Sequence, residues 1–307
     1  MKILVTPRSL TKSGHPALER LKQAGYEVVF SAPGSSPTEE QLLALLPGCV
    51  GYLAGVEPVS GNVLDAAKGL RVISRNGTGI DNVDLEAAQR NHIRVCRAEG
   101  ANARGVAELA FAHILAAVRS VSFSDGCLKK QDWQRRKGLE LEGRTLGLVG
   151  CGRVGRLVAK FALAFDMKVL AYDPCLDASF RPSERFSYAS LTEVLTQADL
   201  ISLHCPANAD GSALIGRQTI ALMKKGVYIV NTARGGLLDD EAVLEALDAG
   251  LIAGVTIDAF ESEPPKDWRL VQHDRVIATP HVGGFTDESV DRAVSVAVDN
   301  LLKALEA

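Results

Sequence analysis

The sequence predicts an α/β protein with two domains, each built on a doubly wound parallel sheet. The chain has 307 residues, about twice the ~150 that one domain usually takes. Short apolar runs alternate with amphipathic segments of helical length along most of the chain. Such alternation requires crossover connections between parallel strands. The 28 glycines and the 47% hydrophobic content agree with this class.

The first hundred residues predict one small α/β domain. Its apolar runs and amphipathic segments succeed one another without a repeat or a low-complexity tract. Strands are expected at residues 2–6, 26–30, 50–54, 71–74 and 94–96, and helices at residues 16–24, 39–46, 62–67 and 85–90.

The pattern changes at residue 102. Residues 102–120 predict a helix that is apolar on nearly all sides, which is typical of a helix buried in a core or between domains. Residues 121–144 are polar and basic around Trp133, and we expect an exposed arm or loop. Two interpretations of this arm stay open: a solvated connection, or an aromatic anchor for a subunit contact. A second α/β series follows to about residue 285, and residues 287–305 predict an amphipathic helix.

Charge and cysteine usage argue against several classes of protein. The formal net charge is -3, which is not the basic surface of a nucleic-acid-binding protein. The longest uncharged stretch, residues 41–56, is shorter than the about 20 residues of a membrane-spanning helix. We therefore expect neither a nucleic acid nor a membrane as partner. The six cysteines show no CxxC pair, so we expect no metal site and a cytoplasmic protein with reduced thiols.

The most informative local motif is a glycine-rich loop between a strand and a helix. The strand at residues 145–149 leads into Gly150-x-Gly152-x-x-Gly155, and a second strand then ends at Asp173. The first glycine permits a sharp turn, the second lets a pyrophosphate approach, and the third allows close helix packing. The order of these parts predicts a Rossmann dinucleotide site. The Asp173 carboxylate would repel a ribose 2′-phosphate, so NAD is favoured over NADP.

Three polar side chains follow three later apolar strands. Arg234, Glu263 and His281 come after the predicted strands at residues 227–231 and 255–257 and the one before residue 279. Because ligands bind beyond the carboxyl ends of such strands, we expect the three to converge. A guanidinium holds a carboxylate bidentately, an imidazole transfers a proton, and a carboxylate orients that imidazole. This set suits hydride transfer to a 2-oxo acid.

Several stretches together resemble the D-isomer-specific 2-hydroxyacid dehydrogenases, and among them the short-form D-3-phosphoglycerate dehydrogenases. The similar stretches are residues 75–88, 101–109, 140–159, 231–247, 258–265 and 279–284. The resemblance implies a Rossmann NAD-binding domain at residues 101–285, inserted into a flavodoxin-like substrate domain made of residues 1–100 and 286–307. It also implies a homodimer formed through the NAD-binding domains.

The resemblance further implies roles for individual residues. Arg234, Glu263 and His281 would be catalytic. Substrate would contact Arg75, Asn76, Gly77, Asn102, Arg234 and His281. The cofactor would contact Thr78, Gly150, Gly152, Arg153, Val154, Gly155, Asp173, Cys205, Thr232, Ala233, Arg234, Asp258, His281, Gly283 and Gly284. Of the other histidines, we expect His113 to be structural and His204 to lie near the cofactor.

The resemblance makes 3-phosphoglycerate the first substrate to consider, with a role in serine biosynthesis. One departure weakens the case for a phosphorylated substrate, since related enzymes often carry an arginine where this chain has Leu53-Ala54-Gly55. Two alternatives stay open. One is a glyoxylate or hydroxypyruvate reductase that uses the same three catalytic residues. The other is a corepressor-like NAD(H) sensor that binds protein partners and turns over little.

Overall fold

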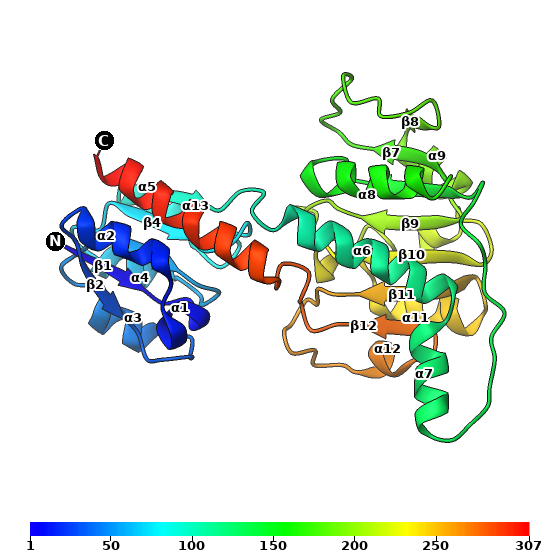
Figure 1. The fold of residues 1–307 in the computed structure, drawn as a ribbon, viewed down its shortest axis with the longest axis horizontal. Helices are drawn as coiled ribbons and strands as arrows, with labels where there is room; N and C mark the ends of the chain where they lie inside the picture. Colours follow the sequence, from blue (N-terminus) through cyan, green and yellow to red (C-terminus); the bar gives the residue numbers. More distant parts are fainter. Residues whose placement is uncertain (307) are drawn as a thin grey trace. The chain divides into compact units, whose positions relative to one another are not determined.

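The computed structural model describes residues 1–306 and separates them into two compact units (Figure 1). Unit 1 comprises Met1–Asn102 together with the last helix, which begins at Asp287. Unit 2 comprises Ala103–Thr286. Each unit contains one sheet in which all paired strands run parallel, with helices on both faces. The predicted fold class is confirmed.

The sheet of unit 1 has five strands in the order β2-β1-β3-β4-β5. This is the flavodoxin-like order, in which the chain reverses direction across the sheet between β1 and β3. The strands are β1 (Lys2–Val5), β2 (Glu27–Phe30), β3 (Cys49–Ala54), β4 (Val72–Arg75) and β5 (Arg94–Arg97).

Two layers of helices complete unit 1. One core lies under α3, α4 and α5, and the other lies under α2 and α13. Helix α13 packs against β3, β4 and β5, and its Val294, Val298 and Leu301 belong to the second core. Thr38, Ser60 and Asp84 begin α3, α4 and α5, because each side chain accepts a backbone N–H of the first turn. The helices are α1 (Arg8–Ser13), η1 (Pro16–Leu18), α2 (Glu19–Gln23), α3 (Glu39–Leu45), α4 (Gly61–Ala66), α5 (Leu85–Arg90) and α13 (Asp287–Glu306).

The sheet of unit 2 has seven strands in the order β12-β11-β10-β9-β6-β7-β8. The first six in sequence follow the Rossmann order, and the chain reverses direction between β6 and β9. Ligands of such sheets bind beyond the carboxyl ends of the strands at this reversal. The strands are β6 (Thr145–Val149), β7 (Lys168–Tyr172), β8 (Phe186–Tyr188), β9 (Leu200–Leu203), β10 (Val227–Asn231), β11 (Ile252–Ile257) and β12 (Val276–Ala278).

Unit 2 has a separate apolar core on each face of its sheet. Helices α6 and α8 cover one face, and α9, α11 and α12 cover the other. These strands are buried on both faces, which explains their nearly continuous apolar runs. The helices are α6 (Ala103–Val118), α7 (Val121–Lys129), α8 (Arg153–Ala164), α9 (Leu191–Gln197), α10 (Arg217–Ile220), η2 (Gly235–Leu237), α11 (Asp240–Asp248) and α12 (Arg269–Gln272).

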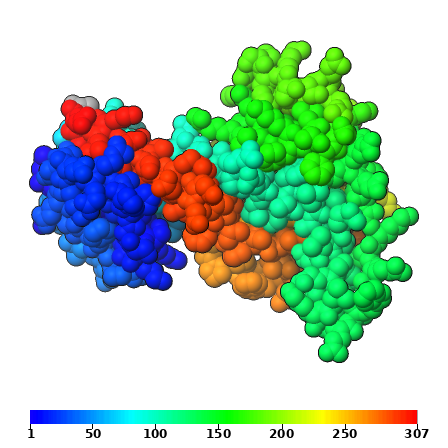
Figure 2. Space-filling view, in the orientation of Figure 1, coloured from blue at the N-terminus to red at the C-terminus, as the bar shows by residue number. Residues whose placement is uncertain are grey.

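The structure differs from the sequence prediction in two local places. Helix α1 is absent from the prediction, because its only buried side chain is Leu10 and it leaves no apolar periodicity. The predicted arm begins with a nine-residue helix, α7, and becomes irregular only after Lys129. No side chain of α7 is buried, and Figure 2 shows this part of unit 2 as a projecting lobe.

Within residues 1–306, no single helix has the length and hydropathy of a membrane span. Helices α6 and α7 meet that criterion only when taken together, and the chain bends by 65° between them.

Candidate functional site

The glycine loop lies where the strand order of unit 2 reverses. Gly150 follows β6 with a φ of +97°, a conformation that favours glycine, and a Cβ here would lie 2.4 Å from the His204 carbonyl oxygen. A Cβ on Gly155 would lie 2.2 Å from the Gly150 carbonyl oxygen, so this glycine lets α8 pack against the loop itself. Nothing lies within 4 Å of the equivalent position on Gly152. The loop therefore leaves open space in front of the α8 N-terminus.

Asp173 lies directly beyond β7 and is held by backbone donors. The Cys151 amide donates to one carboxylate oxygen at 2.7 Å, and the Cys175 amide donates to the other at 2.8 Å. Each oxygen keeps a second lone pair for a ribose hydroxyl. Helix α8 begins at Gly152 without a side-chain cap, so its first N–H groups are available to an anion. These features fit the pyrophosphate and ribose of a dinucleotide.

Neutral side chains that follow β9 and β6 lie at this loop. The His204 imidazole lies 2.9 Å from the Ser202 hydroxyl, and burial lowers the pKa of His204 to about 4. Burial also raises the pKa of the Cys205 thiol and of the Cys151 thiol. At neutral pH these three side chains therefore add no charge beside the glycine loop.

The loop after β10 is shaped by Asn231 and carries Arg234. The buried Asn231 amide donates to the Arg234 carbonyl at 2.7 Å, and its oxygen accepts the Ala233 N–H at 3.1 Å. A Cβ on Gly235 would lie 2.0 Å from the Glu261 nitrogen and 2.1 Å from the Phe260 carbonyl carbon. The Arg234 loop is thus in direct backbone contact with the loop after β11.

The loop after β11 brings Glu263 to His281. Glu263 Oε1 lies 2.7 Å from His281 Nδ1, and the same oxygen accepts the Phe260 N–H at 3.2 Å. His281 follows β12, the neighbour of β11 in the sheet. Because Nδ1 faces the carboxylate, Nε2 is the ring atom left for proton exchange with another molecule. About half of the His281 side chain is exposed.

A hollow of about 380 Å³ adjoins the Glu263–His281 pair within unit 2. Its walls are mostly apolar, and Phe260, Trp268 and Val271 contribute to them. The hollow touches both members of the pair, which themselves stay about half exposed.

Asp258 supports the turn on which His281 lies. This carboxylate is 2% exposed and accepts the Val282 N–H at 2.9 Å and the Gly283 N–H at 2.8 Å. It also accepts the Thr279 hydroxyl at 2.5 Å. Asp258 therefore fixes the backbone on both sides of His281.

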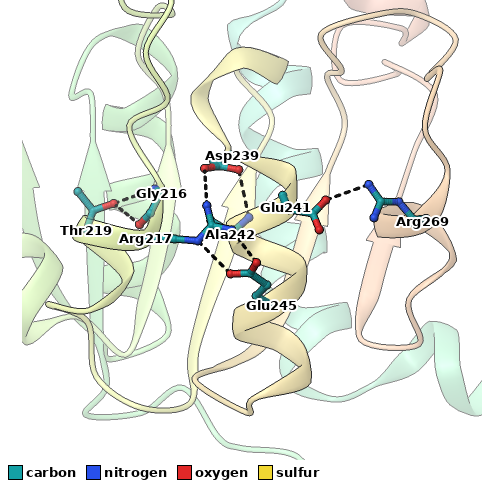
Figure 3. A network of polar contacts seen from close by, with 8 residues as sticks. All are labelled: Gly216, Arg217, Thr219, Asp239, Glu241, Ala242, Glu245 and Arg269. Atoms are coloured by element: carbon teal, nitrogen blue, oxygen red, sulfur yellow. Dashed lines mark hydrogen bonds and ion pairs between the residues drawn. The ribbon is translucent and has the colours of Figure 1, made fainter.

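Polar contacts link helix α11, which follows the Arg234 loop, to α10 before that loop and to α12 after the Glu263 loop (Figure 3). Arg217 of α10 bonds Glu245 of α11, and Arg269 of α12 bonds Glu241 of α11. Asp239 accepts the Ala242 N–H and so begins α11 only a few residues after Arg234. These pairs are exposed, so each contributes little to stability, but they link α10 and α12 to α11.

The remaining predicted cofactor residues of unit 2 lie near the ends of these strands. Arg153 and Val154 form the first turn of α8, Cys205 follows β9, and Gly284 ends the His281 turn. Thr232 and Ala233 follow β10. The Thr232 hydroxyl is buried and has no hydrogen-bond partner among residues 1–306.

Four of the predicted substrate residues, and Thr78 of the predicted cofactor residues, lie in unit 1. Arg75 ends β4, and its guanidinium is oriented by Asn82 Oδ1 at 3.3 Å and by the Asn76 carbonyl at 2.7 Å. Gly77 follows, and the Thr78 hydroxyl lies 2.9 Å from Asn102 Oδ1. Arg75, Asn76, Gly77, Thr78 and Asn102 are thus grouped around the carboxyl end of β4 in unit 1.

Sequence reasoning did not identify Asn231, Asn82 or Thr279 as site residues. Asn231 ends an apolar strand, and an asparagine at such a position often shapes a turn, so a signal existed. Asn82 and Thr279 are recognised only by contacts with residues elsewhere in the chain. Among residues 1–306, no group of three or more His, Cys, Asp or Glu side chains is arranged to hold a metal ion.

Comparisons with known proteins agree with this geometry. The sequence profile described as "D-isomer specific 2-hydroxyacid dehydrogenase, NAD binding domain" matches residues 111–283. The hydroxypyruvate reductase of Thermotoga maritima is 40% identical over 273 residues, which are 87% of this chain and 88% of the relative. The D-3-phosphoglycerate dehydrogenase of Methanocaldococcus jannaschii is 42% identical over 250 residues, 80% of this chain and 48% of the relative. The chain thus spans about half the length of that second relative.

A solved structure is similar along nearly the whole chain. The D-lactate dehydrogenase from Aquifex aeolicus, complexed with NAD and lactic acid, superposes with a TM-score of 0.83 at 30% identity. The match covers 99% of this chain and 95% of that one.

Proposed function

The chain belongs to the D-isomer specific 2-hydroxyacid dehydrogenase family, and on this premise we propose that it is an NAD-dependent enzyme that interconverts a small D-2-hydroxy acid and its 2-oxo acid. The observation that carries the proposal is the 2.7 Å contact between Glu263 and His281 at the ends of neighbouring strands, with the Arg234 loop packed beside it. In such an arrangement Arg234 would hold the substrate carboxylate close to His281, which would donate the proton.

Each of the three residues has a distinct task in the proposed reaction. Bound NADH supplies the hydride that reduces C2 of the oxo acid. The Arg234 guanidinium holds the substrate carboxylate and polarises the adjacent carbonyl. During reduction, His281 Nε2 donates a proton to the carbonyl oxygen. During oxidation of the hydroxy acid, Nε2 accepts this proton. Glu263 orients the ring through Nδ1 and stabilises the imidazolium.

We propose the cofactor site at the glycine loop and the neighbouring strand ends. The α8 N-terminus with Gly150, Gly152 and Gly155 would hold the pyrophosphate, and Asp173 would accept the ribose hydroxyls. Thr232 and Asp258, which directly follow β10 and β11, would line the same edge of the sheet. We also propose that Arg75, Asn76, Gly77 and Asn102 contact substrate and that Thr78 contacts the cofactor.

The first substrate candidate is 3-phosphoglycerate, which would give the protein a role in serine biosynthesis. A second candidate, hydroxypyruvate or glyoxylate, is favoured by the chain that follows β3. This segment, residues 55–60, contains no lysine or arginine. Its only charged side chain, Glu57, is 2% exposed and accepts the Gly55 N–H at 2.8 Å. A phosphate group would find no cation in this segment.

A substrate panel tests the proposal. NADH oxidation is measured with glyoxylate, hydroxypyruvate, 3-phosphohydroxypyruvate, pyruvate and 4-methyl-2-oxopentanoate, and NADPH replaces NADH in a parallel series. We expect steady-state turnover with at least one short oxo acid and slower rates with NADPH. Tight NADH binding without turnover on any acid would instead indicate a corepressor-like sensor.

We propose a homodimer formed through unit 2 and a location in the cytoplasm. Helix α7 buries none of its side chains, and Val121, Leu128 and Trp133 are exposed, Trp133 by 80%. Several large apolar side chains exposed in one short stretch of chain suit a subunit interface. All six cysteines are free thiols, which suits a reducing compartment. Light scattering of the wild type and of Trp133→Ser measures the oligomeric state.

A further inference from the structure

A buried polar chain lies behind the turn that carries His281, wholly within unit 2. The Thr279 hydroxyl lies 2.5 Å from Asp258 Oδ1 and 3.3 Å from His113 Nε2. His113 is 4% exposed and belongs to α6, which packs against β10, β11 and β12. These hydrogen bonds therefore connect a core helix to the strand ends of the candidate site.

The protons in this chain can be assigned from the available donors and acceptors. Asp258 already accepts two backbone N–H groups, so the single hydroxyl proton of Thr279 points to Asp258 as well. The Thr279 oxygen then accepts a hydrogen bond, which requires that His113 Nε2 carries the proton. His113 Nδ1 keeps a lone pair and has no partner among residues 1–306. Burial lowers the pKa of His113, in agreement with a neutral imidazole.

The turn that this chain supports has an unusual backbone. His281 has a φ of +52°, which residues other than glycine rarely adopt. Its N–H donates to the Thr279 carbonyl at 2.9 Å. A Cβ on Gly283 would lie 3.0 Å from Asp258 Oδ2 and 3.4 Å from Val106 of α6. The turn thus packs against the α6 face that carries Val106 and His113. A strained φ such as that of His281 persists only where the surrounding contacts hold it in place.

We propose that His113 is a positioning residue for His281. The His113 Nε2–H donates a hydrogen bond to the Thr279 oxygen. The Thr279 hydroxyl proton therefore points to Asp258. Asp258 in turn holds the backbone on which His281 lies. The inference rests on the proposed function, because it takes His281 as the group that transfers the proton. His113 stays neutral throughout, and no proton passes along the chain.

The experiment compares variants that keep or remove one donor. His113→Met fills a similar volume without an N–H group, and His113→Gln restores an amide N–H at nearly the same reach. We expect His113→Met to lower kcat by roughly 10- to 100-fold, the size of effect that a small misplacement of a reacting group produces. The dissociation constant of NADH should change less than about threefold, and His113→Gln should recover most of the rate.

Thr279 variants test the next link of the chain. Thr279→Val removes the hydroxyl at nearly constant shape, and Thr279→Ser keeps it. We expect Thr279→Val to lower kcat as His113→Met does. Because both residues act through one chain, the double variant should lose little more than either single variant. His92→Asn, at an exposed position of unit 1, is the control for a histidine outside the chain.

A second readout does not depend on turnover. The imidazole signals of His281 are followed by NMR in histidine-labelled protein, assigned by their loss in His281→Ala. We expect His113→Met to shift these signals and His92→Asn to leave them in place. Urea unfolding confirms that each variant is folded under the assay conditions.

The outcomes separate this inference from the proposed function. If the wild type reduces no 2-oxo acid, the proposed function fails, and the NMR series still tests the positioning of His281. Unchanged His281 signals together with an unchanged kcat in His113→Met overturn the inference. So does a folded His113→Gln that is as slow as His113→Met, since the volume at this position would then matter and the donor would not.

Discussion

The Cys151 amide donates a hydrogen bond of 2.7 Å to the Asp173 carboxylate, and this bond ties the glycine turn after β6 to the acid after β7. Asp173 therefore has two tasks in the proposed cofactor site. It offers lone pairs to ribose hydroxyls, and it keeps the phosphate-facing loop in place.

Asp173→Asn should weaken NADH binding about tenfold, because the charge-assisted bonds lose strength. NADPH binding should weaken less or improve, since the repulsion of a 2′-phosphate is removed. Fluorescence titration with both cofactors measures the two dissociation constants. Asp166→Asn is the matched control: Asp166 has a φ of +58°, which asparagine tolerates. Equal losses for both cofactors in Asp173→Asn would contradict the proposed selectivity.

His281→Ala should lower kcat by roughly 10²- to 10⁴-fold, the usual range for a lost general acid–base group. NADH binding should remain, because the glycine loop and Asp173 are untouched. Stopped-flow measurement of a single turnover separates the chemical step from binding. Near-normal turnover would remove His281 from its proposed role.

Gly235→Ala should disturb both loops of the candidate site at once. The new Cβ would lie 2.0 Å from the Glu261 nitrogen, and backbone atoms at that distance must move. We expect the free energy of unfolding to fall by about 1–3 kcal/mol, as for overpacking, and kcat/KM to fall with it. The neighbouring Gly236→Ala is the control, since nothing lies within 4 Å of its Cβ position. Equal behaviour of the two variants would show that the close approach is unimportant.

Asn82→Ala should act on substrate binding through Arg75. The Asn82 amide donates to the Glu57 carbonyl at 2.7 Å, and its oxygen accepts from the Arg75 guanidinium. We expect the KM for the oxo acid to rise about tenfold, the cost of one lost bond to a charged group, with an unchanged dissociation constant for NADH. Asn62→Ala, on the exposed side of α4, is the matched control. A rise in the NADH constant alone would argue against this role of Asn82.

Burial lowers the pKa of His204 to about 4, below its ordinary value of about 6.5. Below about pH 6.5 the unfolded chain therefore binds a proton that the folded chain does not. Stability from this group falls with decreasing pH by up to about 1.4 kcal/mol per pH unit, until about pH 4. His204→Asn should flatten that part of the curve in urea unfolding between pH 7.5 and pH 5. Parallel curves for wild type and His204→Asn would refute the assignment.

Local sequence predicts the strand ends at which Arg234, Glu263 and His281 lie, because long apolar runs mark buried strands and polar residues follow them directly. It does not predict that Gly235 packs on Phe260, or that Thr279 lies between His113 and Asp258. Those contacts join residues far apart in sequence, so no spacing rule reveals them. The helix α7 has no buried face, and its residues therefore carry little of the signal by which helices are recognised.

The return of α13 to the sheet of unit 1 has a consequence for synthesis of the protein. Leu301 and Leu305 lie against Gly51 of β3, and Val298 packs in the same core as Ile3. On the ribosome, β1 and β3 emerge early, but the side chains that cover them emerge nearly two hundred residues after unit 2 begins. The first unit therefore keeps an uncovered apolar face until α13 is synthesised. Unit 2 is complete in sequence before unit 1 is, so it can fold first.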